Sequence, residues 1–507
     1  MASQRSHPVV AAPADTSDAS EPVGPSRRTP WATTLRLVAA PLLASVVLVA
    51  VNASRMDAPF SPAFPSFNTA VWSTGSQAVR EHGWWASRLG AMTEPASGEV
   101  GYAHHPPLTR IEVGVAEQVL GEHRWVDRLP ALLSSLAAIW LCWAWLGACR
   151  FRLGSRSLGV LAVGGSGAML TYGAMLNMEA VWMPVAFALL WAWQRAERRG
   201  GGGWSCFLLG VLGCTAAHQG ILLVGALGVL GVVHARTQRR RLRPHESAVV
   251  AATVVGAALF ALWAWWGSGD LGDLVRIARE RSGAQFGWID FVRSQVEHGV
   301  LLFGIVPLLC LVAGPLLVRD RPDLRGPLAA VWSVGLAYAV VFRQGATIHP
   351  YWNVALLPAV ALGGALLGDQ LARHGRRAVA AGLVACAAFL VIAGVAAQRE
   401  AHLGDGAGEV ARVAGARDDG TFYSTELVAD WVRYESGRPV EPVYTCDAVV
   451  ELAAARPDAE VLTSRYWSGW GSVDDWQRFR TGPDAEVRDD YSLAPAAVLR
   501  DAACAAG

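Results

Sequence analysis

The stretch GYAHHPPLTRI, residues 101–111, places two adjacent histidines and two adjacent prolines between long apolar segments. Proline fixes its own φ angle and disfavours helical geometry in the residue before it, so Pro106 and Pro107 cannot continue a helix. A helical pattern nevertheless resumes directly behind them. We therefore expect a stiff turn that holds Tyr102, His104 and His105 at a fixed height beside neighbouring helices.

The composition around this turn is that of a membrane protein. Of the 507 residues, 53% are hydrophobic and only 17% are charged, whereas a soluble domain carries about 25% charged residues. The apolar residues form blocks near the length of roughly 20 residues that crosses a bilayer. They predict about eleven spans, near residues 34–51, 129–148, 157–176, 179–193, 204–219, 221–234, 247–266, 299–318, 327–342, 352–368 and 378–397.

The short loops give the orientation. Every second loop is rich in arginine, and the intervening turns at 177–179 and 218–220 have none. Cytoplasmic loops carry this excess of arginine. The pattern predicts a multi-pass protein of the cell membrane with a cytoplasmic N-terminus, and it places residues 53–128, 268–298 and the tail after 398 outside the cytosol.

Two outer loops contradict this charge rule. Residues 53–128 hold six arginines, among them Arg80, residues 268–298 hold four, and Arg343 lies at the outer end of a late span. Two interpretations are open. Most of these arginines suit amphipathic helices on lipid headgroups. Two or three suit a site for an anion such as a lipid phosphate, because guanidinium groups make forked hydrogen bonds.

The tail differs in character from the rest of the chain. Short strand-like segments alternate with helical ones at residues 421–467, which predicts a small α/β domain. It contains no glycine-rich nucleotide motif and no zinc spacing, so neither a nucleotide nor a nucleic acid is an expected partner. Cys446 and Cys504 can pair if the tail lies outside the reducing cytosol. We expect three domains: a disordered arm at 1–33, a membrane domain at 34–397 and an extracytoplasmic domain at 398–507.

The layout resembles the GT-C glycosyltransferases, in the branch of protein O-mannosyltransferases and the lipid A aminoarabinose transferase. The residues that carry the resemblance are FNTAVWSTGSQAVREHG (67–83), YAHHPPL (102–108), GEHRWVDRLPALLSSL (121–136), GAMLNMEAVWMPVAFALL (173–190) and IHPYWNVALLPAVAL (348–362). It covers roughly residues 34–397. It implies a mostly α, polytopic helix bundle, with the small α/β tail outside its reach.

The resemblance also implies a reaction. Such enzymes transfer a sugar from a polyprenyl-phosphate donor to an acceptor at the outer membrane face, here a protein, a lipid or a cell-wall glycan. An acidic residue early in the first outer loop acts as base, which makes Asp57 the candidate, in an inverting transfer. The sequence departs from the family at Asn68, where an acid is expected. The other interpretation of Asp57 is an interfacial charge at a helix end.

The donor phosphate needs cationic and hydrogen-bonding partners. Arg343, His349 and Tyr351 stand where family members carry a late His/Tyr element, and we assign Arg343 and His349 to the phosphate. His105 is the histidine expected to touch the donor or the base, and Tyr102 can stack under a sugar. The alternative is that this turn only docks the loop on the bundle. No dedicated cluster of metal ligands is present, so a divalent metal is left open.

Glu179, in MLNMEAVWM, lies at an outer helix end without a nearby charge. Carboxylates at membrane depth are costly and usually functional. It is a candidate second acid, or else an N-terminal helix charge in contact with water.

A rival to the whole enzymatic interpretation is a non-catalytic transporter or scaffold for lipid-linked sugars. The duplicated halves typical of transporters are not visible.

Overall fold

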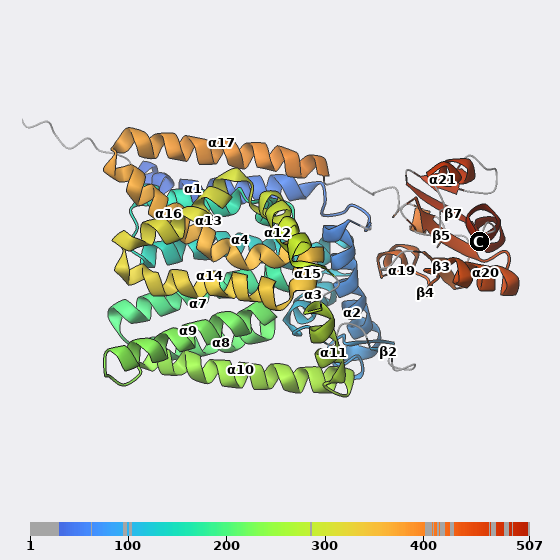
Figure 1. Ribbon diagram of the computed structural model, residues 1–507, viewed down its shortest axis with the longest axis horizontal. Helices are drawn as coiled ribbons and strands as arrows, with labels where there is room; N and C mark the ends of the chain where they lie inside the picture. Colours follow the sequence, from blue (N-terminus) through green and yellow to red (C-terminus); the bar gives the residue numbers. More distant parts are fainter. Residues whose placement is uncertain are drawn as a thin grey trace, which may run out of the picture. The chain divides into compact units, whose positions relative to one another are not determined.

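The structure is a computed structural model (Figure 1). It describes residues 30–61, 63–94, 99–100, 104–283, 286–400, 408, 410–412, 415, 421–425, 430–465, 467, 473–480, 486–488 and 490–504.

Apolar helices, from a single turn to 25 residues in length, form the main part of the described chain. They are α1 (Pro30–Ala53), α4 (Arg124–Ala148), α5 (Leu153–Gly164), α6 (Gly167–Leu170), α7 (Met178–Arg199), α8 (Gly203–Ala216), α9 (His218–Thr237), α10 (Pro244–Ser268), α13 (Ile305–Leu317), α14 (Arg325–Val341), α16 (Leu357–Arg373) and α17 (Arg376–Glu400). Short 3-10 turns η1 (Val318–Asp320), η2 (Pro322–Leu324) and η3 (Pro350–Leu356) join some of them. The polytopic helical bundle expected from the sequence is confirmed.

The helices differ in their capacity to cross a bilayer. Each predicted apolar block falls largely on a helix. Among the described residues, six helices are long and apolar enough to span, or seven if α12 (Trp288–Phe303) and α13, bent by 112°, form one span. This is fewer than the eleven expected. Helices such as α7 lie mostly buried within the bundle and therefore need no continuous apolar surface.

Small residues let the central helices approach closely. A Cβ atom on Gly363 of α16 would lie 1.9 Å from the carbonyl oxygen of Cys310 in α13, and one on Gly159 of α5 would lie 2.5 Å from that of Ala361. In a bilayer the hydrophobic effect does not drive helices together, because lipid tails are as apolar as the side chains. Close backbone contact between helices therefore stabilises their association. The packing of α5, α13 and α16 therefore depends on these glycines.

The predicted outer loops also form helices and short strands. The first contains α2 (Phe64–Ala86), β1 (Met92–Glu94), β2 (Glu99–Val100) and α3 (Leu108–Leu120). Later ones contain α11 (Gly272–Arg281) and α15 (Arg343–Ile348). In α11, Leu274, Ile277, Ala278 and Arg281 follow the spacing of one helix face. This face lines the cavity described below.

The tail contains a five-stranded sheet in the order β4-β3-β5-β7-β6. Its strands are β3 (Phe422–Ser424), β4 (Val440–Pro442), β5 (Glu460–Ser464), β6 (Glu486–Arg488) and β7 (Tyr491–Pro495), with helices α19 (Asp430–Ser436), α20 (Cys446–Ala455), α21 (Val473–Arg480), α22 (Ala496–Leu499) and the π-helical turn η4 (Arg500–Cys504). β3 pairs in parallel with β4 and β5, and β7 pairs antiparallel with β5 and β6. This confirms the small α/β fold.

Cys446 and Cys504 form a disulfide in this domain. The bond joins the start of α20 to η4 at the end of the described chain, and closes a loop with a sequence separation of 58 residues. The other six cysteines are buried thiols. The pairing that the sequence left open is therefore present.

Candidate functional site

The paired histidines face a cavity of about 260 Å³. Its wall is mostly apolar and aromatic, with contributions from Phe260, Tyr338 and Trp352, and its most polar side chains are His104, His105, His218 and Arg281. A pocket of this kind can hold an apolar ligand that carries one polar head.

The His-His-Pro-Pro turn is fixed through its backbone. The carbonyl oxygen of His105 accepts a hydrogen bond from Trp263 Nε1 at 2.8 Å, and His218 Nε2 lies 3.0 Å from the carbonyl oxygen of His104. Helix α3 begins one residue after Pro107. Proline disfavours helical geometry in the residue before it, so these two carbonyls lie ahead of α3 without helical partners and are satisfied by side chains of α9 and α10 instead.

The imidazole rings form a compact group. The ring centroids of His104 and His105 lie 4.4 Å apart, and His105 lies 5.5 Å from both His218 and Trp72. Burial lowers the pKa of His105 well below its usual value, and the nearby His104, His218, Arg110 and Arg281 lower it further. His105 is therefore neutral at physiological pH and can both donate and accept a hydrogen bond.

A chain of hydrogen bonds leads away from the cavity. Arg281 Nη1 lies 3.0 Å from His349 Nε2, and His349 Nδ1 lies 3.2 Å from the Tyr351 hydroxyl. Tyr351 donates to Asn68 Oδ1 at 3.4 Å. His349 and Tyr351 thus lie one step behind the cavity wall. The last member of this hydrogen-bond chain is Asn68 of α2, the position at which the family resemblance leads one to expect an acid.

Other predicted binding residues lie elsewhere. The guanidinium of Arg343 packs 4.5 Å from the Trp288 ring centroid and does not line the cavity. Arg80 is paired with Glu122 at 2.5 Å, and this hydrogen bond raises the pKa of Arg80. Tyr102 falls outside the described residues. The cation at the cavity is Arg281.

The two predicted acids have different surroundings. Asp57 is exposed in the turn after α1. Glu179 is 2% exposed in the first turn of α7 and accepts a hydrogen bond from Gln219 Nε2 at 3.0 Å. Its second carboxylate oxygen has no hydrogen-bond partner among the described residues. Neither acid lines the cavity.

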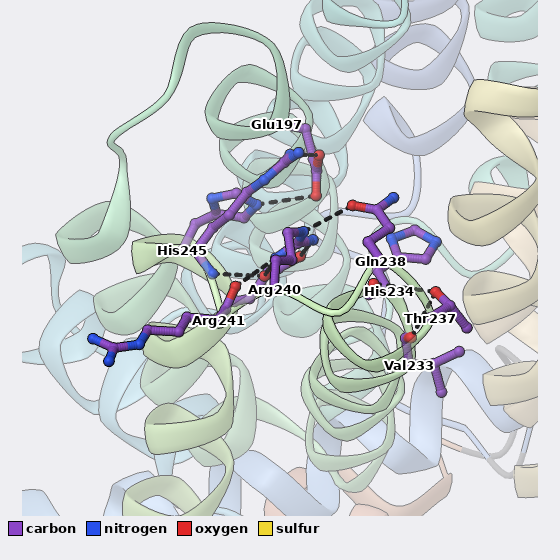
Figure 2. A network of polar contacts seen from close by, with 10 residues as sticks. Glu197, Val233, His234, Thr237, Gln238, Arg240, Arg241 and His245 are labelled. Atoms are coloured by element: carbon purple, nitrogen blue, oxygen red, sulfur yellow. Dashed lines mark hydrogen bonds and ion pairs between the residues drawn. The ribbon is translucent and has the colours of Figure 1, made fainter.

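A second polar cluster occupies the arginine-rich ends of α7, α9 and α10 (Figure 2). Glu197, His245 and Glu246 are close enough to hold a metal ion. Their carboxylates are already paired: Arg243 Nη1 donates to Glu197 at 2.5 Å, and Arg240 donates two hydrogen bonds to Glu246 at 2.6 and 2.7 Å. Two guanidinium groups balance the two carboxylates, so this cluster serves as an ion-pair network between helix ends.

Sequence reasoning did not single out Arg281, Trp263 or Trp352. Arg281 was one of several outer arginines without an assigned role. Its signal is the spacing of Leu274, Ile277, Ala278 and Arg281, which puts the arginine on the apolar face of a short amphipathic helix. Trp263 lies in an apolar span, where nothing in the sequence distinguishes its indole N–H from those of other tryptophans.

No protein-family model and no curated protein sequence matches the chain. Among solved structures, ArnT from Cupriavidus metallidurans bound to undecaprenyl phosphate is similar with a TM-score of 0.61 and 14% identity, over 92% of this chain and 98% of that one. An oligosaccharyltransferase from Archaeoglobus fulgidus, in complex with Zn and sulfate, is similar with a TM-score of 0.56 and 11% identity, over 85% of this chain and 68% of that one. The chain therefore has the fold of the GT-C glycosyltransferases, as its sequence motifs implied.

Proposed function

We propose that this protein is a membrane glycosyltransferase. It takes a sugar from a polyprenyl-phosphate donor and transfers it to an extracytoplasmic protein, lipid or cell-wall glycan. The observation that carries the proposal is the cavity of about 260 Å³, whose apolar wall meets Arg281 and the imidazoles of His104 and His105. These features complement an isoprenoid chain and its phosphate.

The cationic end of the cavity suits the leaving group. As the bond between the sugar and the phosphate breaks, its electron pair moves onto the phosphate oxygen. Arg281 would meet this charge with charge-assisted hydrogen bonds, and neutral His105 would add a further donor. The ArnT structure with bound undecaprenyl phosphate supports a lipid phosphate as the ligand class for this fold.

The acceptor needs a base. In the proposed reaction an acceptor hydroxyl forms the new bond to the sugar carbon from the face opposite the phosphate, and its proton passes to a carboxylate. Asp57 is the proposed base, since its exposure leaves it accessible to a large acceptor. Glu179 is the proposed second acid; it is buried and accepts a hydrogen bond from Gln219.

The proposed orientation places the cavity at the outer membrane face. The N-terminal arm at 1–33 is cytoplasmic, the membrane domain covers 34–397, and the domain at 398–507 lies outside the cytosol. The Cys446–Cys504 disulfide supports this orientation, because disulfides persist in oxidising compartments.

The test uses purified protein in liposomes with radiolabelled polyprenyl-phosphate sugars and membrane acceptors. We expect label to move from the lipid to an acceptor, and Asp57→Asn to abolish this transfer while undecaprenyl phosphate still binds. Asp458→Asn, an exposed acid of the tail, is the matched control. Movement of intact labelled lipid across the bilayer without transfer would favour the transporter instead.

A further inference from the structure

The backbone around Asp57 is fixed by an arginine of α4. Arg128 Nη1 donates to the carbonyl oxygens of Met56 at 3.0 Å and Ala58 at 2.7 Å. Its guanidinium also lies 4.4 Å from the ring centroid of Phe60. These contacts hold the peptides on both sides of the exposed carboxylate. We call residues 56–60 the Asp57 turn.

The far end of the Asp57 turn is held by Glu435 of α19. The Phe60 N–H group donates to Glu435 Oε1 at 2.6 Å. The same carboxylate accepts two hydrogen bonds from Arg124, from Nε at 2.9 Å and from Nη2 at 2.6 Å. A residue of the tail domain therefore binds a main-chain group three positions from the candidate base.

This carboxylate is buried. The side chain of Glu435 is 0% exposed in its ion pair with Arg124. A buried carboxylate is tolerated only when its lone pairs are satisfied. Arg124 and the Phe60 amide satisfy both oxygens, so the ion pair and the position of the Asp57 turn depend on each other.

Apolar contacts surround the pair. Phe60 is 0% exposed and packs edge-on against Tyr434, with ring centroids 4.5 Å apart. Phe60, Trp431 and Phe422 belong to one buried cluster. This packing excludes water from the Glu435 contacts and strengthens them.

We propose that Glu435 is a positioning residue: through the Phe60 amide and Arg124, the tail domain holds the Asp57 turn in the geometry that presents Asp57 to the acceptor. The inference rests on the proposed function, in which Asp57 is the base. It gives the tail domain a role in the transfer step. Glu435 binds a backbone amide of the turn itself, so loss of this contact acts directly on the main chain that carries Asp57.

The first test is hydrogen exchange of residues 54–61 in the full-length protein in lipid nanodiscs. Glu435→Gln replaces a charge-assisted acceptor by a weaker one, so we expect these amides to exchange about 10-fold faster or more. The matched control is Glu460→Gln, which removes another carboxylate paired with an arginine, Arg438, at 3.0 Å within the tail domain. It should leave exchange at 54–61 unchanged. Amides of β3 and β5 should stay protected in both variants, which shows that the domain is folded.

The second test compares rate and binding constants. Glu435→Gln should lower kcat about 10-fold through loss of alignment, with the KM for the lipid donor unchanged, while Glu460→Gln keeps both values. Equal exchange of residues 54–61 in all three proteins, or an unchanged kcat in Glu435→Gln, overturns the positioning role while the transferase proposal stands. If the wild-type protein transfers no sugar although the exchange difference is present, the proposed function fails, and the exchange result shows only that Glu435 holds the turn.

Discussion

Arg281 of α11 donates a hydrogen bond to Nε2 of His349, 68 positions later in the chain, at 3.0 Å. Because a guanidinium only donates, His349 Nε2 must be unprotonated, and the ring proton resides on Nδ1, where it faces the Tyr351 hydroxyl at 3.2 Å. Arg281 is thereby oriented at the cavity by a neutral histidine. Within the described part of the chain this is the hydrogen bond that Arg281 makes, so its other N–H groups can meet a ligand.

Removal of Arg281 should weaken binding of the lipid phosphate. Loss of a bidentate, charge-assisted contact in an apolar cavity predicts an increase in the Kd for undecaprenyl phosphate of about 10-fold to 100-fold in Arg281→Ala. Arg281→Lys should recover part of the lost affinity, because lysine keeps the positive charge but lacks the planar fork of the guanidinium group. Arg279→Ala, an exposed arginine of the same helix, is the control. Equal affinity in the 279 and 281 variants would remove Arg281 from the site.

Acid should destabilise the protein through its buried histidines. Burial, with the charge of Arg281, lowers the pKa of His349 to about 3. The unfolded chain binds a proton near pH 6.5 and the folded one does not, so stability falls as the pH drops below 6.5. For His349 alone the loss is about 2 kcal/mol at pH 5. His349→Gln should flatten the dependence of the Tm on pH, whereas the exposed His374→Gln should not. An identical pH dependence in all three proteins would contradict this assignment.

A buried carboxyl pair gives the opposite pH dependence. Ser76 donates to Glu117 Oε1, and the carboxyl group of Asp127 lies close to that of Glu117. Burial and the charge of Asp127 raise the pKa of Glu117. The folded chain therefore keeps a proton that the unfolded chain releases above about pH 4.5, and this costs stability as the pH rises.

Glu117→Gln removes this titration and keeps an acceptor for the Ser76 hydroxyl. We expect it to raise the free energy of unfolding at pH 8 and to have little effect at pH 4.5. The comparison is Glu81→Gln, an exposed glutamate of α2, measured by thermal unfolding in detergent. A lower Tm for Glu117→Gln at pH 8 would mean that Glu117 is ionised in the folded protein.

The orientation can be checked with thiol labelling. Val450→Cys on exposed α20 should react with a membrane-impermeant maleimide in intact cells, and Arg239→Cys between α9 and α10 should react only after permeabilisation. The six free cysteines are buried and give a low background. The reverse labelling pattern would place the cavity at the cytoplasmic face and overturn the proposed donor side.

The fold was predictable because its signals are local. Apolar blocks and arginine-rich loops define the helices, and the alternation of segments in 421–467 predicted β3, β4, β5, α19 and α20. The strands β6 and β7 were missed. They are short, and their pairing with β5 depends on partners distant in sequence.

The candidate site was predictable only in part. The two prolines mark the turn that brings His104 and His105 to the cavity, so this element was visible in the sequence. Arg281, Trp263 and Glu435 act through partners more than 60 residues away. Such contacts follow from tertiary packing and leave no local periodicity. The roles of Asp57, Glu179, Arg80 and Arg343 stay predictions.

The backbone anchoring of the His-His-Pro-Pro turn has a consequence for how this protein can change. His218 and Trp263 hold carbonyl groups, which every amino acid possesses, and the prolines fix the bend. The bend of the turn therefore does not require an imidazole at position 104 or 105. If the proposed function holds, side chains of similar volume at these two positions would alter the preference for the lipid-linked sugar without rebuilding the backbone of the loop.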